Sequence, residues 1–97
     1  MEFAITIEYG WELFLLQNRT CALSGEILSF ARSMKKPYSL KQTASLDRID
    51  SNLGYIHGNV QWVHKELNVM KMDASQEDFI EWCRKIAHYQ SALNQIC

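Results

Sequence analysis

Two short segments are the only stretches of this chain whose pattern is typical of β-strands. They cover residues 26–30 and residues 44–50, and the second alternates between two faces. Two strands of this length cannot build a parallel sheet, which is normally buried on both of its faces. We therefore expect one antiparallel hairpin in a small α+β fold. The 97 residues suffice for a single domain, 1–97, with one modest core.

Apolar residues outside the hairpin recur at helical spacing in three segments. The first spans about residues 6–17, the second about residues 60–71, and the third begins with Ser75 as its N-cap. Residues 31–43 and 51–59 show no sustained period and are expected to be loops. Several large side chains and one thiol lie in the apolar stripes and are expected in the core: Trp11, Trp62, Trp82 and Cys83.

Composition and charge exclude several broad classes of protein. Apolar residues make up 47% of the chain and charged residues 22%, so the chain should fold. No apolar stretch approaches the length of a membrane span, and the first residues lack the positive charge of a signal peptide. The three cysteines are an odd number at wide spacings, which argues against a disulfide framework. We expect a cytoplasmic protein that does not contact membranes.

Basic residues are concentrated in one part of an otherwise neutral chain. The formal net charge is -1, yet half of the ten basic residues fall between positions 32 and 48, where Asp47 is the only acid. Two interpretations stay open, namely a solvated loop and a strip that faces phosphate groups. The residues concerned are Arg32, Lys35, Lys36, Lys41 and Arg48.

Polar groups gather in two further stretches, residues 46–50 and residues 59–68. The first holds a carboxylate on a strand, and the second presents an amide and an imidazole about twenty residues later on a helix. Such an arrangement can clamp one hard divalent cation, and oxygen ligands favour magnesium or manganese. The chain contains no glycine-rich phosphate loop, no G-x-S-x-G elbow and no paired C-x-x-C motif.

A series of motifs follows one another in a fixed order along the chain: Cys21-x-x-Ser24-Gly25, Ser45-Leu46-Asp47-Arg48-Ile49-Asp50-Ser51, Gly54-Tyr55, Gly58-Asn59-Val60-Gln61-Trp62-Val63, and Asn68 followed by Lys71. This order resembles that of the HNH, or His-Me finger, endonucleases, and is closest to their phage homing and recombination endonuclease VII-like branch. The resemblance covers roughly residues 7–90. It implies a ββα-metal fold, in which a hairpin and a helix hold one metal ion, flanked here by an N-terminal and a C-terminal helix.

The resemblance also assigns roles to individual residues. Asp47 on the strand and Asn68 on the helix match the two metal-ligand positions, and His64 stands where some members keep another ligand. The metal is expected to be Mg²⁺ or Mn²⁺. Asn59 corresponds to the middle asparagine of the HNH motif, which ties down the loop.

The general base of the family is replaced in this chain. Arg48 stands where the family usually has a histidine, and a guanidinium stays protonated in proteins and cannot accept a proton. His57 and His64 are the remaining candidates for the base. Arg48 itself suits a contact with the scissile phosphate, because its fork of donors matches phosphate geometry.

A second departure from the family concerns zinc. Many relatives carry a four-cysteine knuckle, whose positions here hold Cys21, Ser24, His64 and Leu67. Only two of the four side chains can bind zinc, so we expect no structural zinc. Apolar packing around Cys21 and Leu67 should take its place.

The resemblance implies a metal-dependent DNA endonuclease or nickase of a phage-infected or bacterial cell. The replacement of the base keeps a second hypothesis open, a catalytically silent DNA-binding module, and the neutral charge keeps a third, a protein-interaction accessory factor. The chain leaves no room for a separate recognition module, so both a homodimer and a part of a larger chain stay open. The candidate DNA contacts are Arg32, Lys35, Lys36, Lys41, Lys65 and Lys71.

Overall fold

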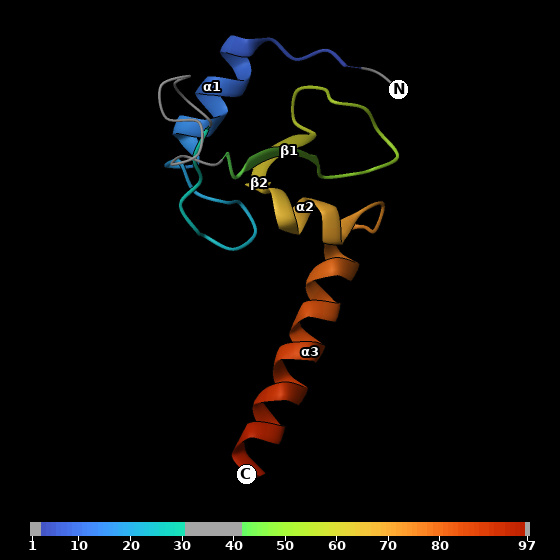
Figure 1. Ribbon diagram of the computed structural model, residues 1–97. Helices are drawn as coiled ribbons and strands as arrows, with labels where there is room; N and C mark the ends of the chain where they lie inside the picture. The colour runs from blue at the N-terminus through green and yellow to red at the C-terminus, as the bar shows by residue number, and fades with distance from the viewer. Residues whose placement is uncertain (1–2, 31–41, 97) are drawn as a thin grey trace.

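The computed structural model describes residues 3–30 and 42–96, with side chains as far as Leu93 (Figure 1). Within these residues the protein has an α+β fold with two strands and three helices, as the sequence predicts. Along the chain the elements are α1 (Ile7–Leu16), β1 (Ala44–Arg48), β2 (Val60–His64), α2 (Lys65–Lys71) and α3 (Gln76–Ile96).

The hairpin consists of β1 and β2, which pair antiparallel with Asp47 opposite Gln61. The prediction that residues 26–30 form its other strand is wrong. Ile27 makes only an isolated bridge to Thr20, and Ile27 is exposed while its neighbour Leu28 is buried. This short segment therefore lies beside the end of α1 and does not join the ladder of the hairpin.

The second helix starts later than its apolar periodicity predicts. Residues 60–64 pair with β1, and α2 begins only at Lys65. The spacing of Val60 and Val63 fits a helix, but non-local pairing with β1 overrides the local preference. His64 ends the strand and caps α2, because its Nδ1 accepts a hydrogen bond from the Glu66 N–H at 3.1 Å.

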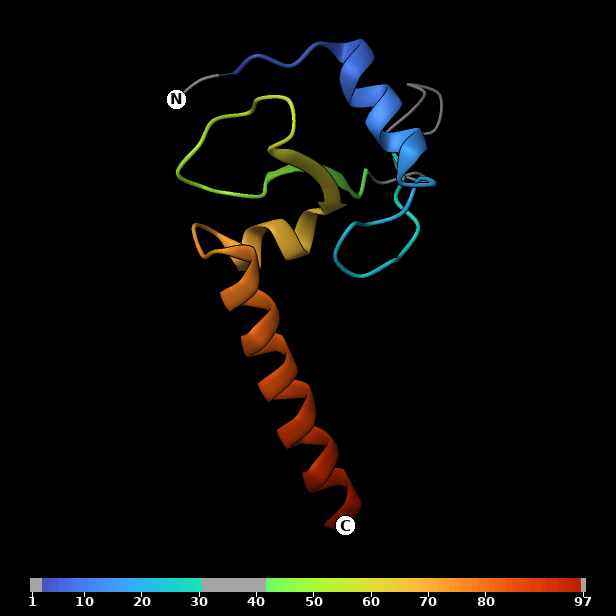
Figure 2. The ribbon, with the colours of Figure 1, turned by 180° about the vertical axis from the view of Figure 1, so that it is seen from behind.

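Helix α1 agrees with its predicted position and packs on β2. Thr6 caps it, accepting a hydrogen bond from the Tyr9 N–H at 3.0 Å. The Trp62 indole N–H donates to the Gly10 carbonyl at 2.8 Å, and the Gln17 amide exchanges hydrogen bonds with the Trp62 backbone at 2.9 and 3.0 Å. These contacts hold α1 against one side of the hairpin, while α2 lies on the other side (Figures 1 and 2).

The core is small and lies where α1, β1, β2 and the segment after α1 meet. Leu23, Phe30, Trp62 and Leu67 pack against it. Its buried members are Phe14, Cys21, Leu28, Ala44 and Val63.

Helix α3 lies outside this core. It runs away from the hairpin and α2, and its last turns are the part farthest from them (Figures 1 and 2). The prediction that Trp11, Trp82 and Cys83 are core residues is wrong, because all three are exposed. Periodicity identified the apolar face of α3, but no described segment covers that face. None of the described helices has the length and apolar character that crossing a bilayer requires.

The core position of Phe14 generates a test of this fold. Phe14→Ala removes a buried ring where α1 meets the hairpin and should lower the free energy of unfolding by about 3 to 5 kcal/mol. Leu16→Ala on the exposed side of the same helix is the matched control and should change it by less than about 0.5 kcal/mol. Urea unfolding followed by circular dichroism measures both, and equal effects would contradict the packing of α1.

Candidate functional site

Asp47 lies buried between the hairpin and α2, and its carboxylate is fully engaged. The Lys71 ammonium lies 3.1 Å from Oδ1 and 3.3 Å from Oδ2 and also donates to the Arg48 carbonyl at 2.8 Å. The Gln61 amide donates to Oδ2 at 3.0 Å. Asp47 is 3% exposed and Lys71 only 1%. Both charges are therefore shielded from water and neutralise each other.

The local sequence explains why this pair forms. Asp47 faces α2 because strand side chains alternate, and Gln61 lies opposite it in the ladder. Lys71 is the last residue of α2, where a positive charge also suits the helix dipole. A buried carboxylate without a partner would be costly, so Lys71 serves as its counter-charge and fastens α2 to the hairpin.

Asn68 lies on the same side of the hairpin as Asp47. Its amide nitrogen donates to the Ser45 hydroxyl at 2.7 Å and to the Leu46 carbonyl at 3.3 Å. Asn68 precedes Lys71 by three residues, which places both side chains on the hairpin-facing side of α2. The structure thus places Asp47 and Asn68, which were predicted as metal ligands, on the same side of the hairpin, where each binds other groups of the chain.

Neither candidate histidine joins this group. His64 lies three positions from Gln61 along β2, on the opposite face of the strand, which corresponds to about 10 Å along the strand. Its Nδ1 caps α2. His57 is exposed in the loop and stacks on the Tyr9 ring with the two centroids 3.9 Å apart.

The side chains at Asp47 do not fit a catalytic metal ion in this arrangement. Among the residues that the structure describes, no group of three histidine, cysteine, aspartate or glutamate side chains could hold a metal. Both Asp47 oxygens already accept hydrogen bonds from Lys71 and Gln61. A hydrolytic Mg²⁺ needs open positions for water and phosphate, and burial of Asp47 leaves none.

Arg48 holds the loop that follows β1. Its Nη1 donates to the carbonyls of Ser51 at 2.7 Å and Leu53 at 3.3 Å. Its guanidinium also lies 5.5 Å from the centre of the Tyr55 ring. Asp73 is 3.9 Å away but highly exposed, so that ion pair contributes little. The donors that would suit a phosphate therefore serve the loop of the chain itself.

Asn59 fastens the other end of the same loop. Its Oδ1 accepts from the Asp50 N–H at 2.9 Å, and its amide donates to the carbonyls of Asp50 at 3.1 Å and Gly54 at 2.8 Å. The Asn59 side chain is buried, and a free amide there would be unfavourable. Arg48 and Asn59 together fix the loop between the two strands.

The predicted DNA contacts are distributed unevenly in the structure. Lys65 is exposed at the start of α2, but Lys71 is buried against Asp47, which does not suit a contact with the DNA backbone. Sequence reasoning missed the pairing of Lys71. One signal in the sequence could have indicated that Lys71 faces the hairpin. Lys71 follows Leu67 by four residues, so the two share a helix face, and Leu67 packs against the core. The remaining candidates lie outside the described residues: Arg32, Lys35, Lys36 and Lys41.

Cys21 stands at the first position of the zinc knuckle with which the sequence was compared, and it is buried. Its Sγ accepts hydrogen bonds from the N–H groups of Leu23 at 3.4 Å, Ser24 at 3.3 Å and His64 at 3.3 Å. Burial opposes the thiolate form, but the hydrogen bonds from Ser24, His64 and Leu23 outweigh it and lower the pKa of Cys21. Cys21 belongs to the core, and Leu67 packs against that core.

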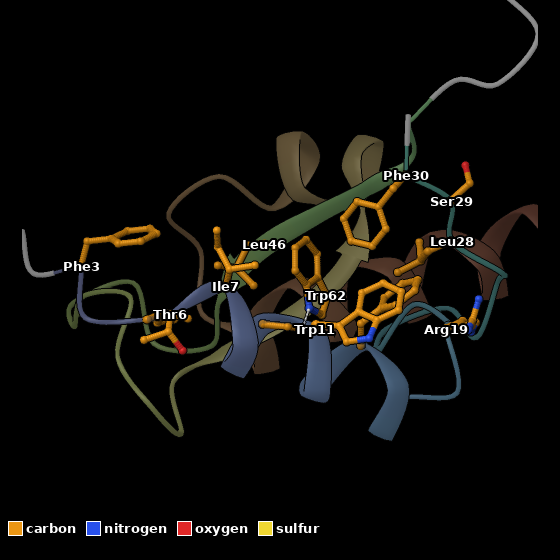
Figure 3. A pocket seen from close by; sticks show the side chains of 13 residues that line it. Phe3, Thr6, Ile7, Trp11, Arg19, Leu28, Ser29, Phe30, Leu46 and Trp62 are labelled. Carbon is orange, nitrogen blue, oxygen red and sulfur yellow. Dashed lines mark hydrogen bonds between the residues drawn. The ribbon is translucent and has the colours of Figure 1, made fainter. Parts of the chain in front are cut away.

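An apolar hollow of about 890 Å³ lies on the α1 side of the hairpin (Figure 3). Aromatic rings from α1, β2 and the segment after α1 form much of its wall: Trp11, Phe14, Phe30 and Trp62. No carboxylate, imidazole or thiol lines it among the residues described. Its polar lining residues are Thr6, Arg19 and Ser29, and the Thr6 hydroxyl already accepts a hydrogen bond from the Tyr9 N–H.

The chain is similar to a protein of a bacterial virus. An uncharacterized 29.0 kDa protein from the dda-modA intergenic region of Enterobacteria phage T4 is 33% identical over 75 residues. The match covers 77% of this chain but only 27% of the relative. No protein-family model matches the chain, and no solved structure matches it.

The buried ion pair generates a stability prediction. Lys71→Met should lower the free energy of unfolding by about 3 to 5 kcal/mol, because it leaves the Asp47 carboxylate buried without a counter-charge. Adding Asp47→Asn should restore part of the loss, since the remaining amide is neutral. Lys65→Met at the exposed start of α2 is the control. Chemical unfolding of the wild type and the three variants measures these changes. A double variant that is less stable than Lys71→Met would contradict the pairing.

The hydrogen bonds to Cys21 generate a pH prediction. The folded protein stabilises the Cys21 thiolate, so the pKa of this thiol is lower in the folded than in the unfolded chain. The stability that the thiolate adds is therefore complete above the unfolded pKa. It is lost as the pH falls through the folded pKa. In a Cys83→Ser, Cys97→Ser background, thiolate absorbance in the ultraviolet should titrate at lower pH when the chain is folded than when it is unfolded in denaturant. A folded midpoint at or above the unfolded one would contradict this.

Proposed function

We propose that this chain is a DNA-binding domain with an HNH-like ββα arrangement that does not hydrolyse DNA through a metal ion. The supporting observation is the Lys71 ammonium, which lies within 3.3 Å of both Asp47 oxygens. One positive charge of the protein itself thus takes the position that a divalent cation would need. This contact favours the hypothesis of a catalytically silent DNA-binding module over that of an endonuclease.

The state of Arg48 supports the same proposal. Hydrolysis needs a base beside the metal, and a guanidinium cannot accept a proton. The Arg48 donors bind loop carbonyls, and neither His57 nor His64 lies beside Asp47 in the structure. The two parts of the hydrolytic machinery, the metal and the base, are therefore both replaced by cations that make structural contacts.

DNA as the ligand rests on the resemblance and on the distribution of charge. Basic residues precede β1 directly, and Lys65 adds an exposed charge on α2. Lysine and arginine contacts to phosphates give affinity that is largely independent of sequence and falls steeply with salt. The likeness to a phage T4 protein of greater length suits a domain that acts in an infected cell and within a larger protein.

A metal-dependent endonuclease or nickase is the second candidate. It is favoured by the position of Asn68 on the same side of the hairpin as Asp47, as the resemblance requires of two ligands. Mg²⁺ or Mn²⁺ would be held by these two residues and would supply charge stabilisation at phosphorus. Lys71 would first have to leave the Asp47 carboxylate.

Supercoiled-plasmid and DNA-binding measurements distinguish these candidates. Metal-stripped wild-type protein should bind duplex DNA with a steep salt dependence, and should produce no nicking when Mg²⁺ or Mn²⁺ is restored. Replacing Lys35, Lys36 and Lys41 by alanine should weaken binding at least tenfold, whereas replacing Arg84 and Lys85 on α3 should not.

Two outcomes would contradict the proposal. Metal-dependent nicking that is lost in both Asp47→Asn and Asn68→Ala would establish the endonuclease. Absence of DNA binding at low salt would remove the DNA-binding function and favour the third hypothesis, an accessory factor that binds another protein.

A further inference from the structure

Helix α3 carries an apolar stripe at the spacing of a coiled-coil seam. Its members follow one another at alternating intervals of three and four residues: Phe79, Trp82, Ile86, Tyr89 and Leu93. Such a repeat of 3.5 residues per turn brings all five to one side of the helix. Trp82, Ile86 and Tyr89 are 62%, 59% and 61% exposed, so the stripe faces solvent.

The exposed area of the chain is large for its mass. The chain exposes 7427 Å², whereas a folded monomer of 11.3 kDa is expected to expose roughly 5,700 Å². The difference exceeds the area of about 800 Å² that each partner buries in a standard interface. Full burial of one large apolar side chain contributes about 1.5 to 3 kcal/mol, so covering the α3 stripe would be strongly favourable.

We propose that α3 pairs with α3 of a second copy of this chain in antiparallel orientation. The apolar stripe of one α3 can pack against the same stripe of another α3. Such a contact between identical patches suits an interface with two-fold symmetry. In the register that aligns the two seams, residues 79–96 of the helices overlap, so Trp82 lies at the level of Leu93 of the second copy and Ile86 at the level of Tyr89.

Helix dipoles favour the antiparallel orientation, because it brings the partly positive N-terminal end of each helix next to the partly negative C-terminal end of the other. Among the charged residues of α3, Asp78 and Lys85 flank the seam. A parallel pair places Lys85 level with Lys85 of the second copy, whereas the antiparallel register places it level with the neutral Gln90.

The corner between α2 and α3 extends the apolar surface. Val69, Met70 and Met72 are exposed there, next to the start of α3. In the antiparallel pair the last turn of the second copy comes level with the first turn of α3, which follows this corner. The dimer would hold two copies of the basic segment before β1, but the proposed pairing does not depend on whether the chain binds DNA.

Light scattering coupled to gel filtration, over a range of protein concentrations, tests the pairing. Wild-type protein should have the mass of a dimer, and Ile86→Glu in the middle of the seam should have that of a monomer. Ser91→Glu, which introduces the same charge on the opposite side of α3, is the matched control and should remain a dimer. The thermal unfolding of the core around Phe14 should be retained in both variants, which separates loss of pairing from loss of folding.

A wild-type chain that stays monomeric at about 100 µM, well above the affinity of a stable interface, would overturn the proposal. A dimer that persists in Ile86→Glu would overturn it as well.

Disulfide cross-linking tests the orientation. In a Cys83→Ser, Cys97→Ser background, chains with Trp82→Cys and chains with Leu93→Cys should form a mixed disulfide when they are combined and oxidised. Neither chain alone should cross-link efficiently. Efficient cross-linking of Trp82→Cys with itself would show a parallel pair and contradict the antiparallel arrangement.

Discussion

The buried ion pair between Asp47 and Lys71 joins the hairpin to α2, and the arrangement of the candidate site depends on it. Both groups are shielded from water, and together with Gln61 and the Arg48 carbonyl they satisfy each other's hydrogen-bonding capacity. Loss of one partner from such a pair costs about 3 to 5 kcal/mol, a large part of the 5 to 15 kcal/mol that stabilises an ordinary domain. The same contacts occupy both oxygens of the carboxylate.

The neighbouring polar residues have structural roles of the same kind. Arg48 and Asn59 bind backbone groups of the loop between the strands, and Asn68 binds Ser45 and Leu46 on β1. Residues to which the resemblance gives catalytic roles therefore hold the hairpin, the loop and α2 in place. Polar residues that match an enzyme motif in sequence can serve stability in the fold, so function has to be argued from the site.

The sequence was most informative where structure is set locally. The apolar spacing of α1 and its Thr6 cap predicted that helix closely, and the alternation after Ala44 predicted β1. The partner of β1 was missed, because Val60 and Val63 fit a helix as well as a strand and only non-local pairing decides between them. The burial of Lys71 and the exposure of Trp82 were missed for a related reason. Periodicity identifies a face of a helix, but it does not say which segment, charge or partner molecule covers that face.

In the structure Lys71, rather than a divalent cation, neutralises Asp47. Direct binding of Mn²⁺, followed by electron paramagnetic resonance of metal-stripped wild-type protein and of Asp47→Asn, tests it without any need for turnover. We expect the two proteins to bind Mn²⁺ equally weakly, because both Asp47 oxygens already accept hydrogen bonds. Saturable binding by the wild type that Asp47→Asn abolishes would contradict it and would assign Asp47 to a metal site.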